Sequence, residues 1–174
     1  MRRSIRLPRR DFLATIALPA LIPSGVLAAA GRPGANERLV VGHIGVGGMG
    51  AGNLKALESE NIVALCDVDA TYLGKAAQRF PAAKTYADFR RMLAEVEKKI
   101  DAVVVSTPDH SHAAPSLMAL RMGKHVYCEK PLTHSVYEAR LVTDTARKNK
   151  RATQLGTQIH AGDNYRRVVE LVQS

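Results

Sequence analysis

The chain has 174 residues, of which 46% are hydrophobic and 24% charged, a composition typical of globular rather than disordered proteins. This length has room for one ordinary domain. The formal net charge is +9, of which the first thirty residues contribute +4. The remaining positive charge forms no long basic run, tryptophan is absent and only 5% of residues are aromatic, so nucleic acid is not an expected partner.

Residues 1–30 have the layout of an export signal. A basic segment precedes an apolar run that ends in Ala28-Ala29-Ala30, a pattern typical of signal-peptidase cleavage. The string Arg9-Arg10-Asp11-Phe12-Leu13 resembles the twin-arginine (Tat) consensus, with departures at Pro8 and Ala14. An ordinary secretory signal or an uncleaved anchor is the alternative, although two prolines in the run disfavour a spanning helix. We predict Tat export to the periplasm or another extracytoplasmic compartment, with the Tat translocon as a transient partner.

After a linker at residues 31–37, short apolar runs alternate with helical stretches, as in a parallel sheet with crossover helices. Strands are expected at residues 39–44, 62–67, 84–86, 102–106, 125–128 and 152–155. Helices are expected at residues 49–58, 70–80, 88–96, 113–122 and 135–148, and a last one from about residue 164. The pattern predicts an α/β fold over residues 38–160, a Rossmann-type doubly wound parallel sheet with strand order 3-2-1-4-5-6.

A glycine-rich loop follows the first expected strand. Gly45-Val46-Gly47-Gly48-Met49-Gly50 fits G-x-G-x-x-G between a strand and a helix, the setting in which this string indicates dinucleotide binding. Asp67 ends the second expected strand, where an acidic side chain meets the adenosine ribose hydroxyls. A carboxylate there repels a 2′-phosphate, so NAD is favoured over NADP, which stays an alternative. The alternative is a glycine-rich turn that binds no ligand.

Two further segments carry a family resemblance. Together with the glycine loop, Ser106-Thr107-Pro108-Asp109-His110-Ser111-His112 and Cys128-Glu129-Lys130-Pro131-Leu132 resemble the Gfo/Idh/MocA oxidoreductases, named for glucose–fructose oxidoreductase, inositol dehydrogenase and a rhizopine catabolism protein. The resemblance covers essentially all of residues 38–174. It implies a Rossmann domain followed by an α/β substrate domain. It also implies hydride transfer between a nicotinamide cofactor and a secondary alcohol of a sugar, cyclitol or related polyol.

The resemblance also implies roles for single residues. Thr107, Pro108 and His112 belong to a loop on the cofactor side, and Glu129 and Lys130 lie beside the nicotinamide. Lys130 reaches towards the substrate alcohol as the catalytic residue, because an ammonium group there can orient the hydroxyl and stabilise developing negative charge. The alternative for Lys130 is a surface lysine before a turn proline.

Neither a metal site nor a disulfide is expected from the histidines and cysteines. The pair His110-x-His112 lacks a third nearby ligand, so no metal site is expected. Cys66 and Cys128 are expected on strands two and five, roughly 14 Å apart and beyond disulfide reach, so both are predicted to be buried free thiols. The residues expected to line a sugar pocket, or else to begin a solvated helix, are His160, Tyr165 and Arg166.

In this family the general acid/base is usually a histidine of the second domain, and no matching Asp-x-x-x-His motif occurs in the chain. We expect the chain to be part of a longer enzyme, with residues 161–174 beginning the connection to a substrate domain that it lacks and that would assemble the homo-oligomer. A truncated product that binds nucleotide without turnover is the alternative. Two other functions stay open: an NAD-dependent glycoside hydrolase that oxidises its substrate only transiently, and a non-catalytic nucleotide-binding module.

Overall fold

The structure is a computed structural model that describes residues 34, 37–157 and 162–174. Contacts between residues divide the chain into two units, residues 1–37 and residues 38–174. The predicted export signal and nearly all of the predicted linker belong to the first unit and lie outside the described residues.

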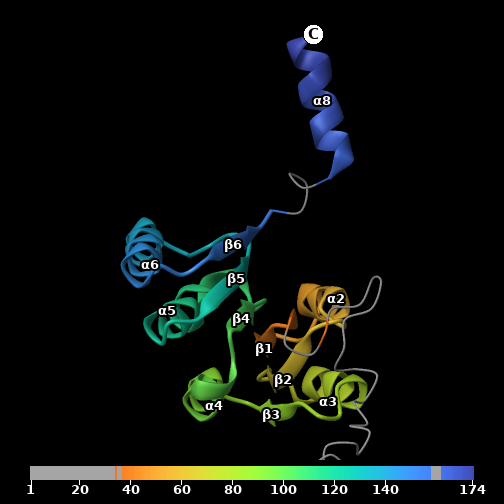
Figure 1. Ribbon diagram of the computed structural model, residues 1–174, viewed down its shortest axis with the longest axis vertical. Coiled ribbons are helices and arrows are strands. Elements are labelled where there is room, and N and C mark those ends of the chain that lie inside the picture. Colours follow the sequence, from red (N-terminus) through yellow and green to blue (C-terminus); the bar gives the residue numbers. More distant parts are fainter. Residues whose placement is uncertain (1–33, 35–36, 158–161) are drawn as a thin grey trace, which may run out of the picture. The chain divides into compact units, whose positions relative to one another are not determined.

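Six parallel strands form one sheet in the order β3-β2-β1-β4-β5-β6 (Figure 1). The strands are β1 (Val40–Ile44), β2 (Asn61–Cys66), β3 (Lys84–Tyr86), β4 (Ala102–Val105), β5 (His125–Glu129) and β6 (Thr153–Gly156). The predicted Rossmann-type fold is confirmed, as is its strand order. The order reverses between β1 and β4, and the crevice beyond the carboxyl ends of these two strands is where such sheets bind ligands.

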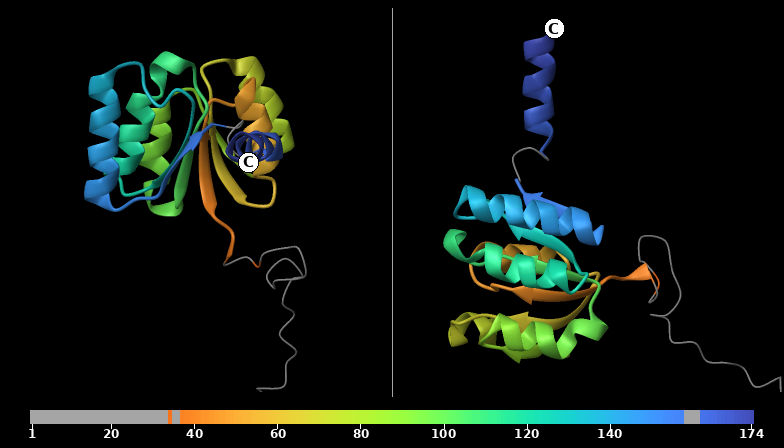
Figure 2. Two further views of the ribbon diagram at one scale, coloured as in Figure 1. Left: turned by 90° about the horizontal axis from the view of Figure 1, so that it is seen from above. Right: turned by 90° about the vertical axis from the view of Figure 1, so that its left-hand side faces the viewer.

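The helices cover both faces of this sheet (Figure 2). Helices α4, α5 and α6 lie on one face and α2 and α3 on the other. Their bounds are α2 (Met49–Ala56), α3 (Ala70–Arg79), α4 (Phe89–Val96), α5 (Ala113–Arg121) and α6 (Val136–Asn149). Two short 3-10 turns that the sequence did not predict are η2 (Glu97–Lys99) and η3 (Asp109–Ser111).

The helix starts differ from the predicted ones for a physical reason. Asp88 and Ser135, expected as first helical residues, are N-caps with extended backbone. The Asp88 carboxylate accepts a hydrogen bond from the Arg90 backbone N–H at 2.8 Å, and Ser135 Oγ accepts one from Glu138 N–H. Each cap thereby satisfies a backbone donor that has no partner within the helix.

The core lies on both faces of the sheet, because the central strands are buried on each side. Val103, Val104 and Val105 of β4 are at most 5% exposed, as the unbroken apolar run predicted. One cluster includes Met92, Leu93 and Leu120 from the helices α4 and α5. A smaller cluster on the other face includes Leu54 and Leu65. This packing fixes the carboxyl ends of the strands, from which the candidate site is built.

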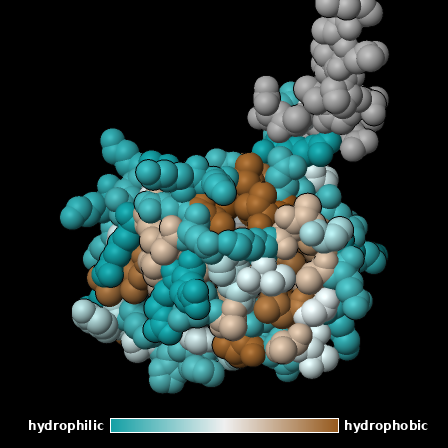
Figure 3. Space-filling view, turned by 90° about the horizontal axis from the view of Figure 1, so that it is seen from below, coloured by the Kyte–Doolittle hydropathy of each residue, from teal (hydrophilic) through white to brown (hydrophobic). Residues whose placement is uncertain are grey.

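The last described helix is α8 (Asp163–Gln173), close to the predicted start near Asn164. All its residues are exposed, including the apolar side chains of Val168, Val169, Leu171 and Val172. None of the helices in the described part of the chain combines the length and apolarity needed to cross a membrane. On the face of the molecule seen in Figure 3, hydrophilic side chains predominate and the apolar ones lie in small patches between them.

Candidate functional site: a dinucleotide pocket

The glycine loop joins β1 to α2 in a turn that only glycine fits. Gly45 has a φ of +84°, and a Cβ there would lie 2.5 Å from the carbonyl oxygen of Ser106. A Cβ on Gly50 would lie 2.0 Å from the Gly45 carbonyl oxygen. Helix α2 therefore begins in direct contact with the strand ends, and its N-terminus is a favourable position for a phosphate.

Asp67 follows β2 and contacts this loop. Its Oδ2 accepts a hydrogen bond from the Val46 N–H at 2.8 Å, and its Oδ1 accepts one from the Asp69 N–H at 2.9 Å. The two bonds fix the orientation of the carboxylate. Each carboxylate oxygen can accept more than one hydrogen bond, so the group keeps the capacity to bind a ribose diol.

A pocket of about 650 Å³ lies at this switch point. Six of the residues predicted to bind the cofactor line it: Gly45, Gly47, Met49, Asp67, Thr107 and Pro108. Thr107 Oγ1 is buried and has no hydrogen-bond partner among the described residues. A buried hydroxyl without a partner is costly, and a polar group of a bound nucleotide would supply the missing bond. The glycine cradle, the fixed carboxylate and this hydroxyl together fit NAD.

Glu129 and Lys130 lie at the end of β5, outside the lining of this pocket. The Glu129 side chain is 4% exposed, and its Oε1 accepts hydrogen bonds from Asn53 Nδ2 at 2.9 Å and from the Tyr127 hydroxyl at 3.0 Å. Lys130 is exposed, and the peptide bond that follows it is cis. The structure thus buries the carboxylate and leaves the neighbouring ammonium group accessible.

His112 is fully buried and does not line the pocket. Its Nδ1 lies 2.5 Å from the Pro131 carbonyl oxygen and its Nε2 lies 2.6 Å from the Thr107 carbonyl oxygen. The ring joins the loop after β4 to the loop after β5. His112, predicted to bind the cofactor, therefore joins these two loops instead of lining the pocket.

The other predicted site residues have different positions. Val46 and Gly50 are buried within the loop, and Gly48 is exposed at its tip. Tyr165 and Arg166 lie on α8 and are exposed, whereas His160 lies outside the described residues. The assignment of these last three to a sugar pocket stays a prediction.

Sequence reasoning missed several residues at the site. Tyr72, His110 and Ser111 line the pocket, and a Cβ on Gly47 would lie 2.8 Å from the Tyr72 ring. Asn53 and Tyr127 hold Glu129. For Tyr127 a signal existed, because residues two apart on one strand share a face. For Asn53 and Tyr72 the contact depends on how the first two helices pack, which no local pattern encodes.

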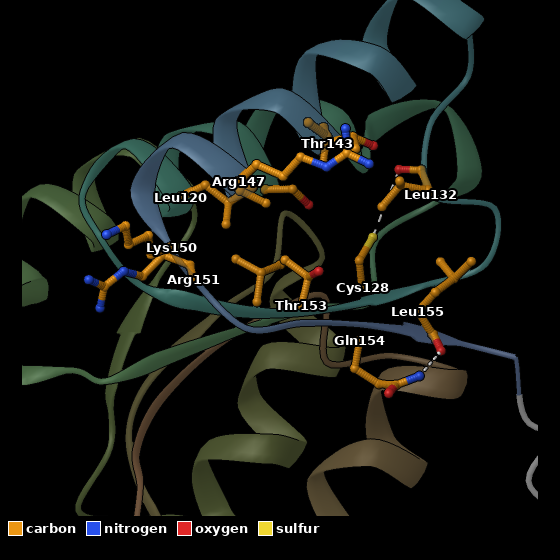
Figure 4. A pocket seen from close by; sticks show the side chains of 14 residues that line it. Leu120, Cys128, Leu132, Thr143, Arg147, Lys150, Arg151, Thr153, Gln154 and Leu155 are labelled. Carbon is orange, nitrogen blue, oxygen red and sulfur yellow. Dashed lines mark hydrogen bonds between the residues drawn. The ribbon is translucent and has the colours of Figure 1, made fainter.

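A second cavity, of about 310 Å³, lies between α5, α6 and the β5–β6 edge of the sheet (Figure 4). Cys128 lines it, and its thiol points towards the Leu132 carbonyl oxygen, while Lys150 and Arg151 extend away from the thiol. Burial raises the pKa of Cys128 to about 11 and that of Cys66 to about 12. Both cysteines are buried and free, as predicted. Protonated thiols are poor nucleophiles, so neither is placed in the reaction.

A Rossmann sheet whose switch point holds a glycine loop, a fixed carboxylate and an orphan hydroxyl is a dinucleotide-binding domain. The model of the Gfo/Idh/MocA oxidoreductases, a family with an NAD-binding Rossmann fold, matches residues 39–157. The chain belongs to this family, and NAD is its cofactor. Across the described residues, no group of three or more His, Cys, Asp or Glu side chains is placed to hold a metal ion.

Dehydrogenases and glycosyl hydrolases are both found among the relatives of the chain. The chain is 28% identical over 142 residues to inositol 2-dehydrogenase of Salmonella typhimurium, a match that covers 78% of the chain and 42% of the relative. It is 27% identical over 197 aligned positions to a glycosyl hydrolase family 109 protein of Shewanella pealeana, covering 97% and 43%. The crystal structure of myo-inositol 2-dehydrogenase from Lactobacillus plantarum superposes with a TM-score of 0.71 at 25% identity, covering 78% and 41%. The chain spans about two fifths of the length of each.

Proposed function

We propose that this chain is the cofactor-binding part of an exported enzyme that transfers hydride between NAD and a secondary alcohol of a sugar, cyclitol or related polyol. One observation carries the proposal: the pocket at the switch point and the Glu129-Lys130 segment stand at the carboxyl ends of neighbouring strands. The similarity to inositol dehydrogenases supports the substrate class.

Each part of the site has a separate task in this proposal. NAD supplies the hydride acceptor when it is bound. The N-terminus of α2 and the glycine turn before it hold its pyrophosphate, and Asp67 accepts hydrogen bonds from the hydroxyls of its adenosine ribose. A 2′-phosphate beside the Asp67 carboxylate is repelled, so NAD is preferred over NADP. Thr107 and Pro108 line the same pocket at the end of β4.

Lys130 is the catalytic residue in this proposal. Its exposed ammonium group donates a hydrogen bond to the substrate alcohol oxygen, orients the hydroxyl and stabilises the negative charge that develops there.

Replacement of Lys130 tests this role. In Lys130→Met we expect NADH affinity to stay within about twofold, because the nucleotide pocket is untouched, and turnover of a polyol substrate to fall by about a hundredfold or more. Lys148→Met, at an exposed position on α6, is the matched control. Near-normal turnover in Lys130→Met would remove Lys130 from the reaction.

A second function is favoured by one observation, the similarity to a glycosyl hydrolase family 109 protein. In an NAD-dependent hydrolase the bound cofactor would supply only a transient oxidation of a ring hydroxyl, and water would replace the leaving group with no net redox change. The net redox change separates the two proposals. A dehydrogenase accumulates NADH and a ketone in equal amounts, whereas the hydrolase releases a sugar with no net NADH.

We further propose Tat-dependent export, assembly into a homo-oligomer and a sugar pocket that includes His160, Tyr165 and Arg166. The Arg9-Arg10 pair supports export, and the exposed apolar side chains of α8 support burial of that helix in an assembly. Replacing Arg9 and Arg10 together by lysine is expected to retain the precursor in the cytoplasm. Unchanged export of this variant would instead indicate an ordinary secretory signal.

A further inference from the structure

We propose that Asn53 is a positioning residue for Lys130: through Glu129 it ties the helix that carries the dinucleotide loop to the strand end that carries the catalytic lysine. Tyr127 supports the same arrangement, because its hydroxyl also donates a hydrogen bond to Glu129. The inference deepens the proposed function and rests on it for turnover alone, because the contacts themselves are properties of the fold.

Asn53 lies one helical turn after Gly50 on α2 and bridges two strand ends. Its single amide nitrogen donates to Ser106 Oγ at 2.9 Å and to Glu129 Oε1 at 2.9 Å. These bonds use both amide protons. Helix α2 is thereby joined to the segment after β4 and to the end of β5, the two segments that flank the nicotinamide side of the site.

On its other side, the Glu129 carboxylate contacts residues of its own strand β5 and of the edge strand β6. The Tyr127 hydroxyl donates to the same Oε1 at 3.0 Å. On β6, a Cβ at Gly156 would lie 2.8 Å from Glu129 Oε2 and 2.6 Å from the Tyr127 hydroxyl oxygen. Gly156 thus leaves room for the pair, and the carboxylate has one orientation between α2 and β6.

The chemistry of Tyr127 suits a permanent donor. Burial, together with the hydrogen bond to Glu129, raises the pKa of Tyr127 to about 12. The hydroxyl therefore keeps its proton throughout the neutral range. Two neutral donors then hold one carboxylate oxygen, a satisfied buried network of the kind that rigidifies its surroundings.

The consequence for Lys130 follows from the chain. Lys130 is bonded directly to Glu129, so the orientation of Glu129 fixes the backbone from which the lysine side chain extends. Helix α2 begins at Gly48 and Met49, in the loop that faces the pyrophosphate. One helix therefore sets both the cofactor position and the lysine position. A misplacement of about 1 Å between reacting groups is enough to cost about a hundredfold in rate.

The test uses Asn53→Leu, which keeps the side-chain shape and removes both donors, and Tyr127→Phe, which removes only the hydroxyl. The matched control is Gly52→Ala, on the same helix, where an added Cβ meets nothing within 4 Å. Each variant is measured for NADH affinity, for hydrogen–deuterium exchange of the backbone over residues 127–133, and for turnover of a polyol panel that includes myo-inositol.

In Asn53→Leu we expect exchange over residues 127–133 to rise about tenfold while the rest of the sheet is unchanged, NADH affinity to stay within about threefold, and kcat to fall by about tenfold to a hundredfold. In Tyr127→Phe we expect a smaller rise in exchange over residues 127–133 and a smaller fall in kcat. In the Lys130→Met background Asn53→Leu adds no further loss of turnover, because it acts through the lysine.

Two results would overturn the proposal: local exchange that stays at the wild-type rate in Asn53→Leu, or exchange that rises over the whole domain with activity lost in proportion to the folded fraction. Absence of polyol turnover in the wild type counts against the proposed function instead. The exchange measurement still decides whether Asn53 holds the Glu129-Lys130 segment in that case.

Discussion

The fold holds the Asp67 carboxylate in a fixed orientation at the end of β2. The carboxylate accepts hydrogen bonds from the Val46 and Asp69 N–H groups in the absence of a ligand, so it does not have to be reoriented when a nucleotide binds. Such preorganisation lowers the entropy cost of binding. The residue is therefore expected to govern both affinity and the choice between NAD and NADP.

Asp67→Asn tests this expectation. The amide keeps the size of the side chain but loses the charge and one acceptor, so a charge-assisted bond to the ribose diol is replaced by a neutral one. We expect NADH affinity to fall by about tenfold and the preference for NADH over NADPH to narrow by a similar factor. Calorimetric titrations with both nucleotides measure this. Unchanged affinity for both would exclude Asp67 from the adenosine site.

His43, in the middle of β1, makes the fold sensitive to acid. It is fully buried, and desolvation by burial lowers its pKa from 6.5 to about 3. The unfolded chain binds this proton between those two values and the folded chain does not, so stability is complete above about pH 6.5 and is lost as the pH falls towards 3.

The expected loss from His43 between pH 7.5 and pH 5 is about 2 kcal/mol in the free energy of unfolding. His43→Leu removes the titrating ring, so we expect the variant to show a correspondingly smaller difference between the two pH values. Urea unfolding of the wild type and of His43→Leu at pH 7.5 and at pH 5 measures the free energy of unfolding in each case. Equal acid sensitivity in both proteins would show that His43 is not the group responsible.

At the residue scale, site residues could be predicted from the sequence where they lie close together in one continuous segment. The glycine loop and Asp67 belong to a single strand–loop–helix–strand unit, and six predicted residues line one pocket. The burial of Glu129 was not predictable, because its partners come from α2 and from two strands. Neither was the burial of His112, whose ring nitrogens contact carbonyl oxygens 5 and 19 residues away.

At the scale of elements, the packing of α2 on β1 is the contact on which the site depends. Gly50 and Gly52 of this helix differ in the space that is available for a side chain. The position of a Cβ on Gly50 lies 2.0 Å from the Gly45 carbonyl oxygen, whereas a Cβ on Gly52 faces open space. The helix therefore packs closely on the loop at Gly50 and not at Gly52.

This contrast predicts opposite effects of the same substitution. Gly50→Ala forces the helix off the loop, so we expect a loss of about 1–3 kcal/mol in stability together with the loss of NADH binding. Gly52→Ala replaces a flexible residue at an open helical site, so we expect a gain of about 0.5–1 kcal/mol with unchanged binding. Thermal unfolding and NADH titration compare the two, and equal behaviour would contradict the packing described.

Element types were predictable from the sequence, and element ends less so. Every predicted strand and helix is present within the described residues, because apolar runs and caps alternate clearly. The ends differ where capping decides them, as at Asp88 and Ser135, and the turn η3 follows Pro108 without an apolar signature.

At the scale of the whole molecule, the sheet order separates the two cysteines. Cys66 ends β2 and Cys128 lies on β5, with β1 and β4 between them. The proposed export would expose the protein to oxidising conditions, but this topology keeps the two cysteines from forming a disulfide with each other.

The expected outcome is slow alkylation of both thiols in the native protein near neutral pH and complete alkylation of both after denaturation, since burial and raised pKa values act together. Mass spectrometry of iodoacetamide-treated protein counts the labelled thiols. Rapid labelling of Cys128 would show that the cavity beneath α6 opens to solvent in solution.

NMR chemical-shift mapping with NADH tests whether the nucleotide binds at the switch point between β1 and β4. We predict that the amide resonances of residues 45–50, 67–69 and 106–111 shift together on titration, while those of Val142, Thr143 and Ala146 beside the second cavity do not. Shifts confined to the second cavity, or no shifts at saturating NADH, would show that the nucleotide does not bind at the switch point.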